Sequence, residues 1–234
     1  MANGSPTDIA AAIARHLTSR GVPPTQAWMQ SFMPSIRPNT PLVALQKTAL
    51  FRLLATDLTT SVQTSASSTL PANLSDPEVR ERTLPGPVTV QVLDIEDIGR
   101  SRWSQVQALD AHERGETTRG REIIRVVADE SDPNASAAHH ESASSGPHKL
   151  LLQDANGLTI YAVELASIHG VGVQTCIGAK LVLSDDVVVA RGLLLLEPRN
   201  VEVLGGKVEA WDQAWRAGRK EVLERKAGMT SHGG

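Results

Sequence analysis

The sequence contains one cysteine, few aromatic side chains and no long apolar run. A single cysteine, Cys176, in 234 residues excludes an internal disulfide framework and a cysteine-based zinc site, and it favours a reducing compartment. No apolar segment approaches the ~20 residues of a membrane span, and the N-terminus lacks the charged start and apolar centre of a signal peptide. With a net charge of −3, the chain has no overall attraction for nucleic acid. The composition therefore predicts a soluble globular protein with no membrane association.

Residues 8–62 predict a bundle of three short helices. Apolar residues recur there at helical spacing in three segments, each bounded by capping residues, glycine or proline. The boundaries are Thr7 or Asp8 and Gly21 for the first helix, Pro24 and Pro34 for the second, and Thr40 as N-cap with Pro41 in the first turn for the third. A bundle of this size buries little apolar surface, so we expect it to dock onto the domain that follows.

Residues 63–86 are predicted to form a linker, because serine, threonine and alanine dominate its first part. A strand begins after Pro87, where Val88, Val90 and Val92 alternate with polar residues. The apolar phase then changes to Leu93 and Ile95, which indicates a β-bulge that bends the strand. We therefore expect a curved sheet to start at residue 87.

The remaining strands complete a small barrel. A hairpin is predicted around Asn156-Gly157, and residues 177–204 predict two long strands interrupted by bends. After Gly205-Gly206, apolar residues recur at helical spacing through Trp211 and Trp215. Five curled antiparallel strands and a closing C-terminal helix over residues 87–226 predict an OB-fold, and an α+β protein as a whole. Residues 227–234 are predicted to be a disordered tail.

A long insert, residues 99–148, interrupts the predicted barrel after its first strand. Trp103 and Val106 are expected to pack back on the barrel and anchor the insert. Beyond them the insert is polar and of low complexity, which predicts disorder, except for one apolar run. That run consists of Ile123, Ile124, Arg125, Val126 and Val127. An apolar run in a polar loop marks a partner-binding site, and the alternative is an extra edge strand of the barrel.

Two interpretations also apply to Lys180, which begins a predicted strand. The lysine would either present its charge to a partner or be solvated at the strand end. Three histidines of the insert, His139, His140 and His148, are predicted to be solvated because no carboxylates accompany them at helical spacing. The sequence also lacks a G-x-S-x-G nucleophile motif. We therefore expect no catalytic residue, no cofactor and no metal.

Isolated carboxylates and glycines support the same conclusion. Asp94, Glu96 and Asp97 are expected to be solvated at a strand end, and Asp185-Asp186 to form a turn. Gly205-Gly206-Lys207 lacks the spacing and the hydroxyl of a phosphate-binding loop, so a tight strand-to-helix turn is expected there.

Single-stranded nucleic acid is the alternative ligand, since many OB-folds bind it through aromatic platforms and a basic groove. The predicted barrel strands contain one aromatic residue, Tyr161. A cluster of cations on the C-terminal helix would provide at most a weak electrostatic contact or a solvated face: Arg216, Arg219, Lys220, Arg225 and Lys226. We therefore favour protein–protein contact over autonomous binding of single strands.

The sequence resembles the RecQ-mediated genome instability protein 1 family. The strongest block is G-x-L-L-L-x-P-x-N-V-x-V-L-G-G-x-V-E at residues 192–209. Further matches are L-L-L-Q-D-A-N-G at 150–157, I-G-A-K-L at 177–181, S-Q-V-Q-A-L at 104–109, P-P-T-Q-A-W at 23–28 and F-R-L-L-A-T-D-L at 51–58. The resemblance covers residues 8–216 apart from the linker and the later insert. It is closest to the short, fungal-type form with a single OB-fold and no second C-terminal barrel.

This resemblance implies a non-catalytic nuclear subunit that associates with topoisomerase III and a RecQ-type helicase. The implied activity is stimulation of decatenation and of the dissolution of double Holliday junctions, in DNA replication, repair and homologous recombination. DNA would be contacted mainly through the complex. The resemblance also implies that the insert reaches the topoisomerase gate, although its sequence departs from the family after about Leu109.

Overall fold

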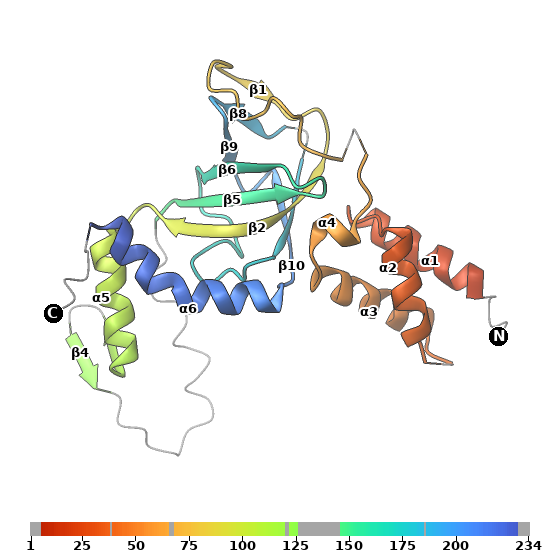
Figure 1. Ribbon diagram of the computed structural model, residues 1–234, viewed down its shortest axis with the longest axis horizontal. Helices are drawn as coiled ribbons and strands as arrows, with labels where there is room; N and C mark the ends of the chain where they lie inside the picture. Colours follow the sequence, from red (N-terminus) through yellow and green to blue (C-terminus); the bar gives the residue numbers. More distant parts are fainter. Residues whose placement is uncertain are drawn as a thin grey trace.

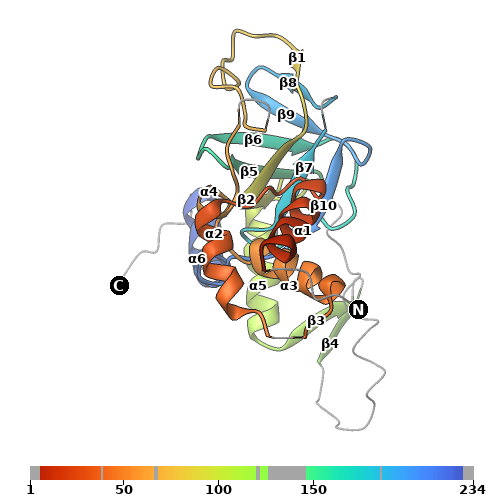
Figure 2. The same cartoon turned by 90° about the vertical axis from the view of Figure 1, so that its right-hand side faces the viewer.

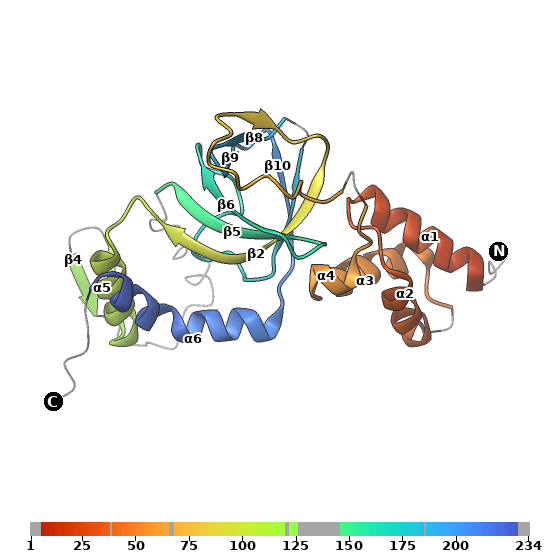
Figure 3. The same cartoon turned by 45° about the horizontal axis from the view of Figure 1, so that its top comes forward.

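The computed structural model describes residues 6–37, 39–65, 68–119, 122–125, 146–184 and 186–228. It is an α+β protein in which a helical bundle lies at one end of a curled sheet and the base of the insert lies at the other (Figure 1). We call the curled sheet the barrel. The long C-terminal helix, α6 (Glu209–Lys226), runs along the barrel toward the insert (Figure 3).

The bundle contains the three expected helices and a short fourth one. Its elements are α1 (Pro6–Ser19), α2 (Gln26–Phe32), the 3-10 turn η1 (Met33–Ser35), α3 (Leu42–Leu54) and α4 (Leu58–Ser61). Thr25 caps α2, since its Oγ1 accepts a hydrogen bond from the backbone N–H of Trp28. The predicted cap of α3 is wrong. Pro41 occupies the N-cap position, while Thr40 Oγ1 donates to the carbonyl of Arg37.

In the part of the chain that the structure describes, the barrel has eight strands, so the prediction of five is wrong. They are β1 (Arg82–Thr83), β2 (Val88–Asp97), β5 (His148–Asp154), β6 (Thr159–Glu164), β7 (Lys180–Leu183), β8 (Val188–Ala190), β9 (Leu193–Leu196) and β10 (Val201–Gly205). Their order is β1-β8-β9-β6-β5-β2-β7-β10. The two long strands expected over residues 177–204 are four short ones. β6 and β9 pair in parallel, and the other neighbours are antiparallel.

The bend in β2 is where the apolar phase changes. β2 pairs with β5 on one side and β7 on the other, and its register against β5 shifts between Val92 and Asp94. Val92 and Ile95 are both fully buried, so each phase of the strand contributes to the core. The predicted bulge is confirmed. It lets one strand of ten residues pass from the bundle end of the barrel to the insert end.

Much of the predicted linker is part of the barrel. Leu70, Leu74 and Leu84 are buried in the barrel core, and β1 pairs with β8. The backbone N–H of Leu70 also donates to the carboxylate of Asp154 at 2.7 Å. Since these leucines belong to the same apolar cluster as β2 and β5, the barrel begins near residue 70 instead of at 87.

Seen from the bundle end, the helices lie in front of the barrel (Figure 2), and hydrogen bonds join the two parts directly. The fully buried amide of Gln91, on β2, accepts from the backbone N–H of Leu58 at 2.9 Å and donates to Asp57 at 2.8 Å. Thr89 Oγ1 donates to the carbonyl of Gly21 at 2.5 Å. Gly206 has φ of 91°, and a Cβ there would lie 2.4 Å from the carbonyl oxygen of Leu54. Glycine at this position therefore allows the close approach of bundle and barrel.

Candidate partner interface at the base of the insert

The insert leaves the barrel through a narrow neck between β2 and β5. A Cβ at Gly99 would lie 2.5 Å from Cα of Gly146, so the two backbone segments are in contact where the insert begins and ends. The backbone N–H of Ile98 donates to the carbonyl of Pro147 at 3.0 Å, and Asp97 Oδ1 accepts from the N–H of Gly99 at 2.9 Å. A side chain larger than hydrogen therefore does not fit at position 99 or 146.

A helix, α5 (Arg102–Glu113), forms the first part of the insert. Ser101 caps it by accepting from the backbone N–H of Ser104 at 3.1 Å. The buried amide of Gln105 donates to the carbonyls of Asp97 and Arg100 at 2.8 and 3.1 Å. Val106 is buried beside it. These contacts tie the helix to the end of β2, so the base of the insert is an ordered extension of the barrel.

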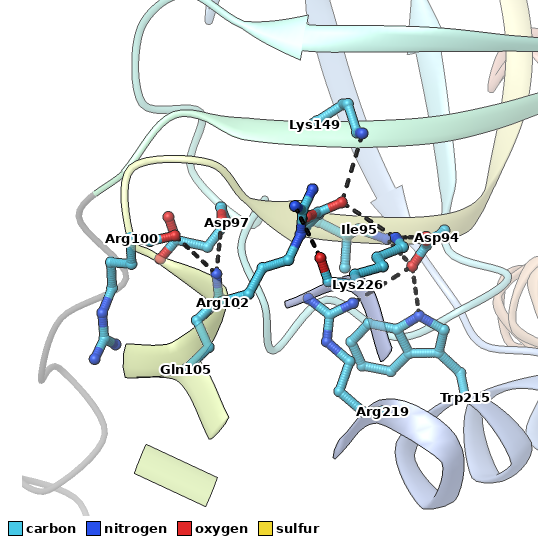
Figure 4. A network of polar contacts seen from close by, with 11 residues as sticks. Asp94, Ile95, Asp97, Arg100, Arg102, Gln105, Lys149, Trp215, Arg219 and Lys226 are labelled. Atoms are coloured by element: carbon cyan, nitrogen blue, oxygen red, sulfur yellow. Dashed lines mark hydrogen bonds and ion pairs between the residues drawn. The ribbon is translucent and has the colours of Figure 1, made fainter. Parts of the chain in front are cut away.

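Glu96, on β2, pairs with three cations from three different elements, and the cations Arg102, Lys149 and Lys226 are labelled in Figure 4. Its side chain is 3% exposed and is contacted by Arg102 of α5 at 2.8 Å, Lys226 of α6 at 3.2 Å and Lys149 of β5 at 3.5 Å. Burial raises the pKa of this carboxyl, but hydrogen bonds from Arg102 and Lys226 and the charges of Lys226 and Lys149 outweigh it and lower the pKa to about 2. The ionised carboxylate therefore links the barrel, α5 and α6.

Asp94 forms a second link to α6 at the bulge of β2. Its Oδ1 accepts a hydrogen bond from Nε1 of Trp215 at 2.7 Å and lies 3.7 Å from Nη1 of Arg219 (Figure 4). The guanidinium of Arg219 lies over the Trp215 ring, 4.7 Å from its centroid. Without the bulge, Asp94 would occupy a different face of the strand, so the bend in the sheet and the position of α6 depend on each other.

The helices α5 and α6 are also joined directly. Lys220 contacts Asp110 at 2.5 Å and Glu113 at 2.9 Å, one turn apart on α5. Hydrogen bonds to Asp110 and Glu113 raise the pKa of Lys220 above its ordinary range. The C-terminal part of α6 therefore packs against α5 at this end of the molecule (Figure 1).

The apolar run of the insert is partly in a small hairpin. Strands β3 (Glu116–Arg119) and β4 (Glu122–Arg125) pair antiparallel, with Thr117 opposite Ile124. Among the described residues these strands form a sheet of their own, so Ile123, Ile124 and Arg125 do not add an edge strand to the barrel. Val126, Val127 and the predicted disordered region up to residue 145 lie outside the described residues, as do residues 229–234 of the tail.

Trp103 does not have the expected position. It lies on α5 like Val106, but its side chain is 55% exposed. Residues three apart on a helix point in directions about 60° apart, so Trp103 and Val106 lie on adjoining parts of the helix surface. The buried part of that surface contains Val106 and not Trp103. The prediction that Trp103 anchors the insert on the barrel is therefore wrong, and the indole forms part of the accessible surface of α5.

Lys180 is not at the surface. It is fully buried between barrel and bundle, and its Nζ donates to the carbonyls of Leu54, Thr56 and Gly178 at 3.0, 2.6 and 2.7 Å. Burial lowers its pKa to about 8, against the opposing charge of Asp57. The expectation of a lysine that offers its charge to a partner or to solvent is corrected. Lys180 joins the end of α3 to β7 within this chain.

The prediction that His148 is solvated is wrong, because this residue belongs to β5 and its side chain is buried. Nδ1 of His148 lies 2.5 Å from the carboxylate of Glu164. Among the described residues no group of three or more histidine, cysteine or carboxylate side chains is arranged to hold a metal ion. His139 and His140 lie outside these residues.

No helix in the described part of the chain is both long and apolar enough to span a membrane.

The aromatic residue of the barrel strands is accessible. Tyr161, on β6, is 48% exposed, and the ammonium of Lys149 lies 5.3 Å from its ring centroid. Leu193, its register partner on β9, is also exposed. A flat ring beside a cation is one element of a base-stacking platform.

Sequence reasoning missed the charged groups that hold the insert in place. Glu96 and Asp97 were expected to be solvated, and both are buried. Arg219 was assigned to a solvated helix face, and it is buried as well. The sequence signal that could have indicated them is complementary charge. An acidic strand end and a helix with a basic last turn occur in the same sequence, and opposite charges of this kind attract each other.

Comparison with known proteins identifies two domains in this order. The family model described as RMI1, N-terminal helical domain, matches residues 17–61, and that described as RMI1, N-terminal OB-fold domain, matches residues 70–219. The second match confirms the predicted OB-fold, and its start agrees with a barrel that begins near residue 70.

Curated proteins show the same relationship. The chain is 27% identical over 232 residues to RecQ-mediated genome instability protein 1 of Schizosaccharomyces pombe, covering 94% of this chain and 96% of that protein. It is 30% identical over 161 residues to the protein of the same name from Xenopus laevis, covering 68% of this chain and 26% of that protein. Tudor domain-containing protein 3 of Xenopus tropicalis is 31% identical over 96 residues, 41% of this chain and 14% of that protein. Since the OB-fold model alone matches more than half of the chain, and the helical model precedes it in the same order, the chain belongs to the RMI1 family.

Proposed function

We propose that this protein is a non-catalytic accessory subunit of a complex of topoisomerase III and a RecQ-type helicase. The observation that supports this proposal is that the base of the insert is held firmly on the barrel, in a chain of the RMI1 family. The barrel holds the insert by a neck, a buried amide and two charged links, all of them at the end away from the bundle. Because the base of the insert is already fixed, little conformational freedom is lost there when the insert binds a partner.

The proposed activity is stimulation of decatenation and of the dissolution of double Holliday junctions in the nucleus. A topoisomerase of this type alternates between a closed and an open gate. An insert that binds the open state better shifts that equilibrium by its difference in affinity for the two states. The barrel would hold the insert in position, and the chemistry would belong to the topoisomerase.

Replacing residues 116–145 by an eight-residue glycine-serine linker tests the role of the insert. Eight residues span up to about 26 Å, enough to return from the end of α5 to the neck without disturbing either. We expect stimulation of topoisomerase III to fall at least about tenfold, which corresponds to about 1.4 kcal/mol of differential binding. Decatenation by topoisomerase III with each variant measures this. Undiminished stimulation by the shortened protein would remove the insert from the mechanism.

The apolar run is tested by a matched pair of substitutions at Ile124. Ile124→Glu places a charge in the run, whereas Ile124→Val keeps it apolar and β-branched. We expect the glutamate variant to lose affinity for topoisomerase III and the valine variant to bind like the parent protein. Equal affinities for all three proteins would show that the run is not a contact.

Binding of single-stranded nucleic acid remains the second candidate function, because Tyr161 and Lys149 provide one aromatic and cationic platform. Stacking on one ring is worth about 1–3 kcal/mol per base, so Tyr161→Ala should weaken any such binding about tenfold or more. Titration of labelled single strands at increasing salt measures it, with Leu193→Ala as a neighbouring control without a ring. Submicromolar, salt-sensitive binding by the isolated protein would favour this function.

A further inference from the structure

A groove lies on the surface of the bundle between α2 and the end of α3. Its volume is about 310 Å³, and its lining includes Trp28, Ser31 and Phe32 of α2 and Phe51 and Arg52 of α3. Both phenylalanines of the chain and one of its four tryptophans therefore lie at one small surface. Among the described residues that line this groove, none is acidic. We call it the bundle groove.

The three rings of the bundle groove differ in exposure. Phe51 is 75% exposed, whereas Trp28 and Phe32 are buried and stack on each other with their ring centroids 5.0 Å apart. The stacked pair belongs to the core of the bundle, so it forms a fixed apolar floor. Phe51 stands beside this floor in solvent. An apolar side chain of a partner that packed between Phe51 and the floor would remove apolar surface of both from water.

Arg52 is a positioned and accessible cation at the same groove. Its guanidinium lies over the Phe32 ring, 5.6 Å from the centroid, and its Nη1 donates to Oγ of Ser35 at 2.5 Å. Arg52 is exposed, and its Nε and Nη2 have no acceptor in the part of the chain that the structure describes. A carboxylate binds a guanidinium through two parallel hydrogen bonds. Because the Arg52 side chain is already held in position, pairing with a carboxylate costs little further conformational freedom.

The charge of the bundle favours an acidic ligand. Residues 6–62 contain five arginine or lysine residues and two aspartates, which gives a net charge of +3 in a chain whose total is −3. One of the aspartates, Asp57, accepts hydrogen bonds from Gln91 and from the backbone N–H of Thr59. Lys47, one turn before Phe51 on α3, is exposed. Complementary charge of this kind selects partners and speeds their association.

We propose that the bundle groove binds an acidic amphipathic helix of a partner protein, with an apolar side chain against Trp28 and Phe32 and a carboxylate paired with Arg52. A groove between two helices is a common binding site for such a helix. Nucleic acid fits the groove less well, because its phosphate backbone is bound by a row of cations and the lining contains one. A second copy of the chain also fits less well, since two bundles of the same net charge repel each other.

This inference goes beyond the proposed function and does not depend on it. The bundle and the base of the insert lie at opposite ends of the molecule (Figure 1 and Figure 3). A partner on the bundle groove therefore leaves the insert accessible.

A designed peptide tests the chemistry of the groove. The probe is a helix of about 18 residues with leucine and phenylalanine on one face and glutamate and alanine on the other, which is long enough to be helical in water. Its counterpart has lysine in place of every glutamate. We expect the full chain to bind the acidic peptide at least about tenfold more tightly than the basic one, as measured by calorimetry.

Substitutions on the bundle separate the groove from the general charge. Phe51→Glu and Arg52→Glu should each raise the Kd for the acidic peptide at least about tenfold. Val43→Glu and Arg15→Glu are the matched controls, because they change the net charge by the same amounts at exposed positions that do not line the groove. Both controls should bind within about twofold of the parent protein. Since Phe51 is exposed, Phe51→Glu should also keep the Tm of the parent protein.

Each outcome decides for or against the inference. Weaker binding by the two groove variants with unchanged binding by the controls supports it. Equal losses in all four variants, equal affinities for the two peptides, or no binding by the parent protein overturn it. Dimerisation of the parent protein that Phe51→Glu abolishes also overturns it, because a second copy then occupies the groove. If a groove variant does not fold, NMR of the parent protein decides: the acidic peptide should shift amides within 28–35 and 51–56, and shifts confined to other residues overturn the inference.

Discussion

Replacing Lys180 by alanine is expected to destabilise the protein by about 3 kcal/mol and to loosen the bundle from the barrel. The ammonium donates to three main-chain carbonyls, two of them at the end of α3 and the following turn and one on the barrel. Each buried acceptor left without a donor costs about 1 kcal/mol or more, and loss of the aliphatic stem adds a cavity term. Chemical denaturation measures the free energy of unfolding, and hydrogen exchange of the α4 amides measures the loosening.

Lys207→Ala is the control for this experiment. Lys207 lies just before α6, and it is exposed and pairs with Glu209 at the surface. Exposed ion pairs contribute little to stability, so this variant should unfold like the parent protein. If Lys180→Ala also unfolded like the parent protein, the three hydrogen bonds would not hold the bundle in place.

The stability provided by Lys180 should depend on pH in a defined direction. Since its pKa is lowered to about 8 in the folded protein, the folded state releases the proton at a lower pH than the unfolded chain, where the pKa is 10.5. Between these values the unfolded state binds more protons, so stability rises with pH. The difference in unfolding free energy between the parent protein and Lys180→Ala should therefore widen from pH 8 to pH 10.5. A difference that narrowed over this range would contradict the lowered pKa.

Lys180 also illustrates what one sequence does not reveal. A lysine at a strand start is solvated in most contexts, and its burial here depends on carbonyls that lie more than 120 residues away in the chain. The linker failed as a prediction for the same reason. Leu70 and Leu74 are the only leucines in a stretch of serine, threonine, alanine, proline and asparagine, and only the assembled barrel provides the core that buries them and Leu84.

Local patterns predicted other features well. The change of apolar phase after Val92 located the bulge, because alternation in a strand directly records which side faces the core. The asparagine-glycine turn located the hairpin of β5 and β6. The candidate site was harder, since its parts come from β2, α5 and α6. The apolar run of the insert was visible in the sequence, whereas the charged contacts of Glu96 and Asp94 required the positions of all three elements.

Replacing Glu96 by glutamine is expected to cost about 2–3 kcal/mol at pH 7 and to free the base of the insert. Its carboxylate is buried and holds cations of α5, α6 and β5. Its pKa of about 2 in the folded protein, against 4.5 ordinarily, corresponds to about 3 kcal/mol, which the partial exposure of the partner cations reduces. Hydrogen exchange of the α5 amides should increase in this variant, while exchange in the bundle should not change.

Acid should have the same effect on the parent protein as the substitution. The lowered pKa means that the ionised carboxylate stabilises the folded state fully above about pH 4.5, and that this contribution is lost as the pH falls toward 2. The difference in unfolding free energy between the parent protein and Glu96→Gln should therefore be constant from pH 7 to about pH 5 and shrink below it. A difference that persisted at pH 2 would mean that the side chain acts through its shape and not through its charge. A difference that disappears there would show that ionised Glu96 holds α5, α6 and the root of the insert together.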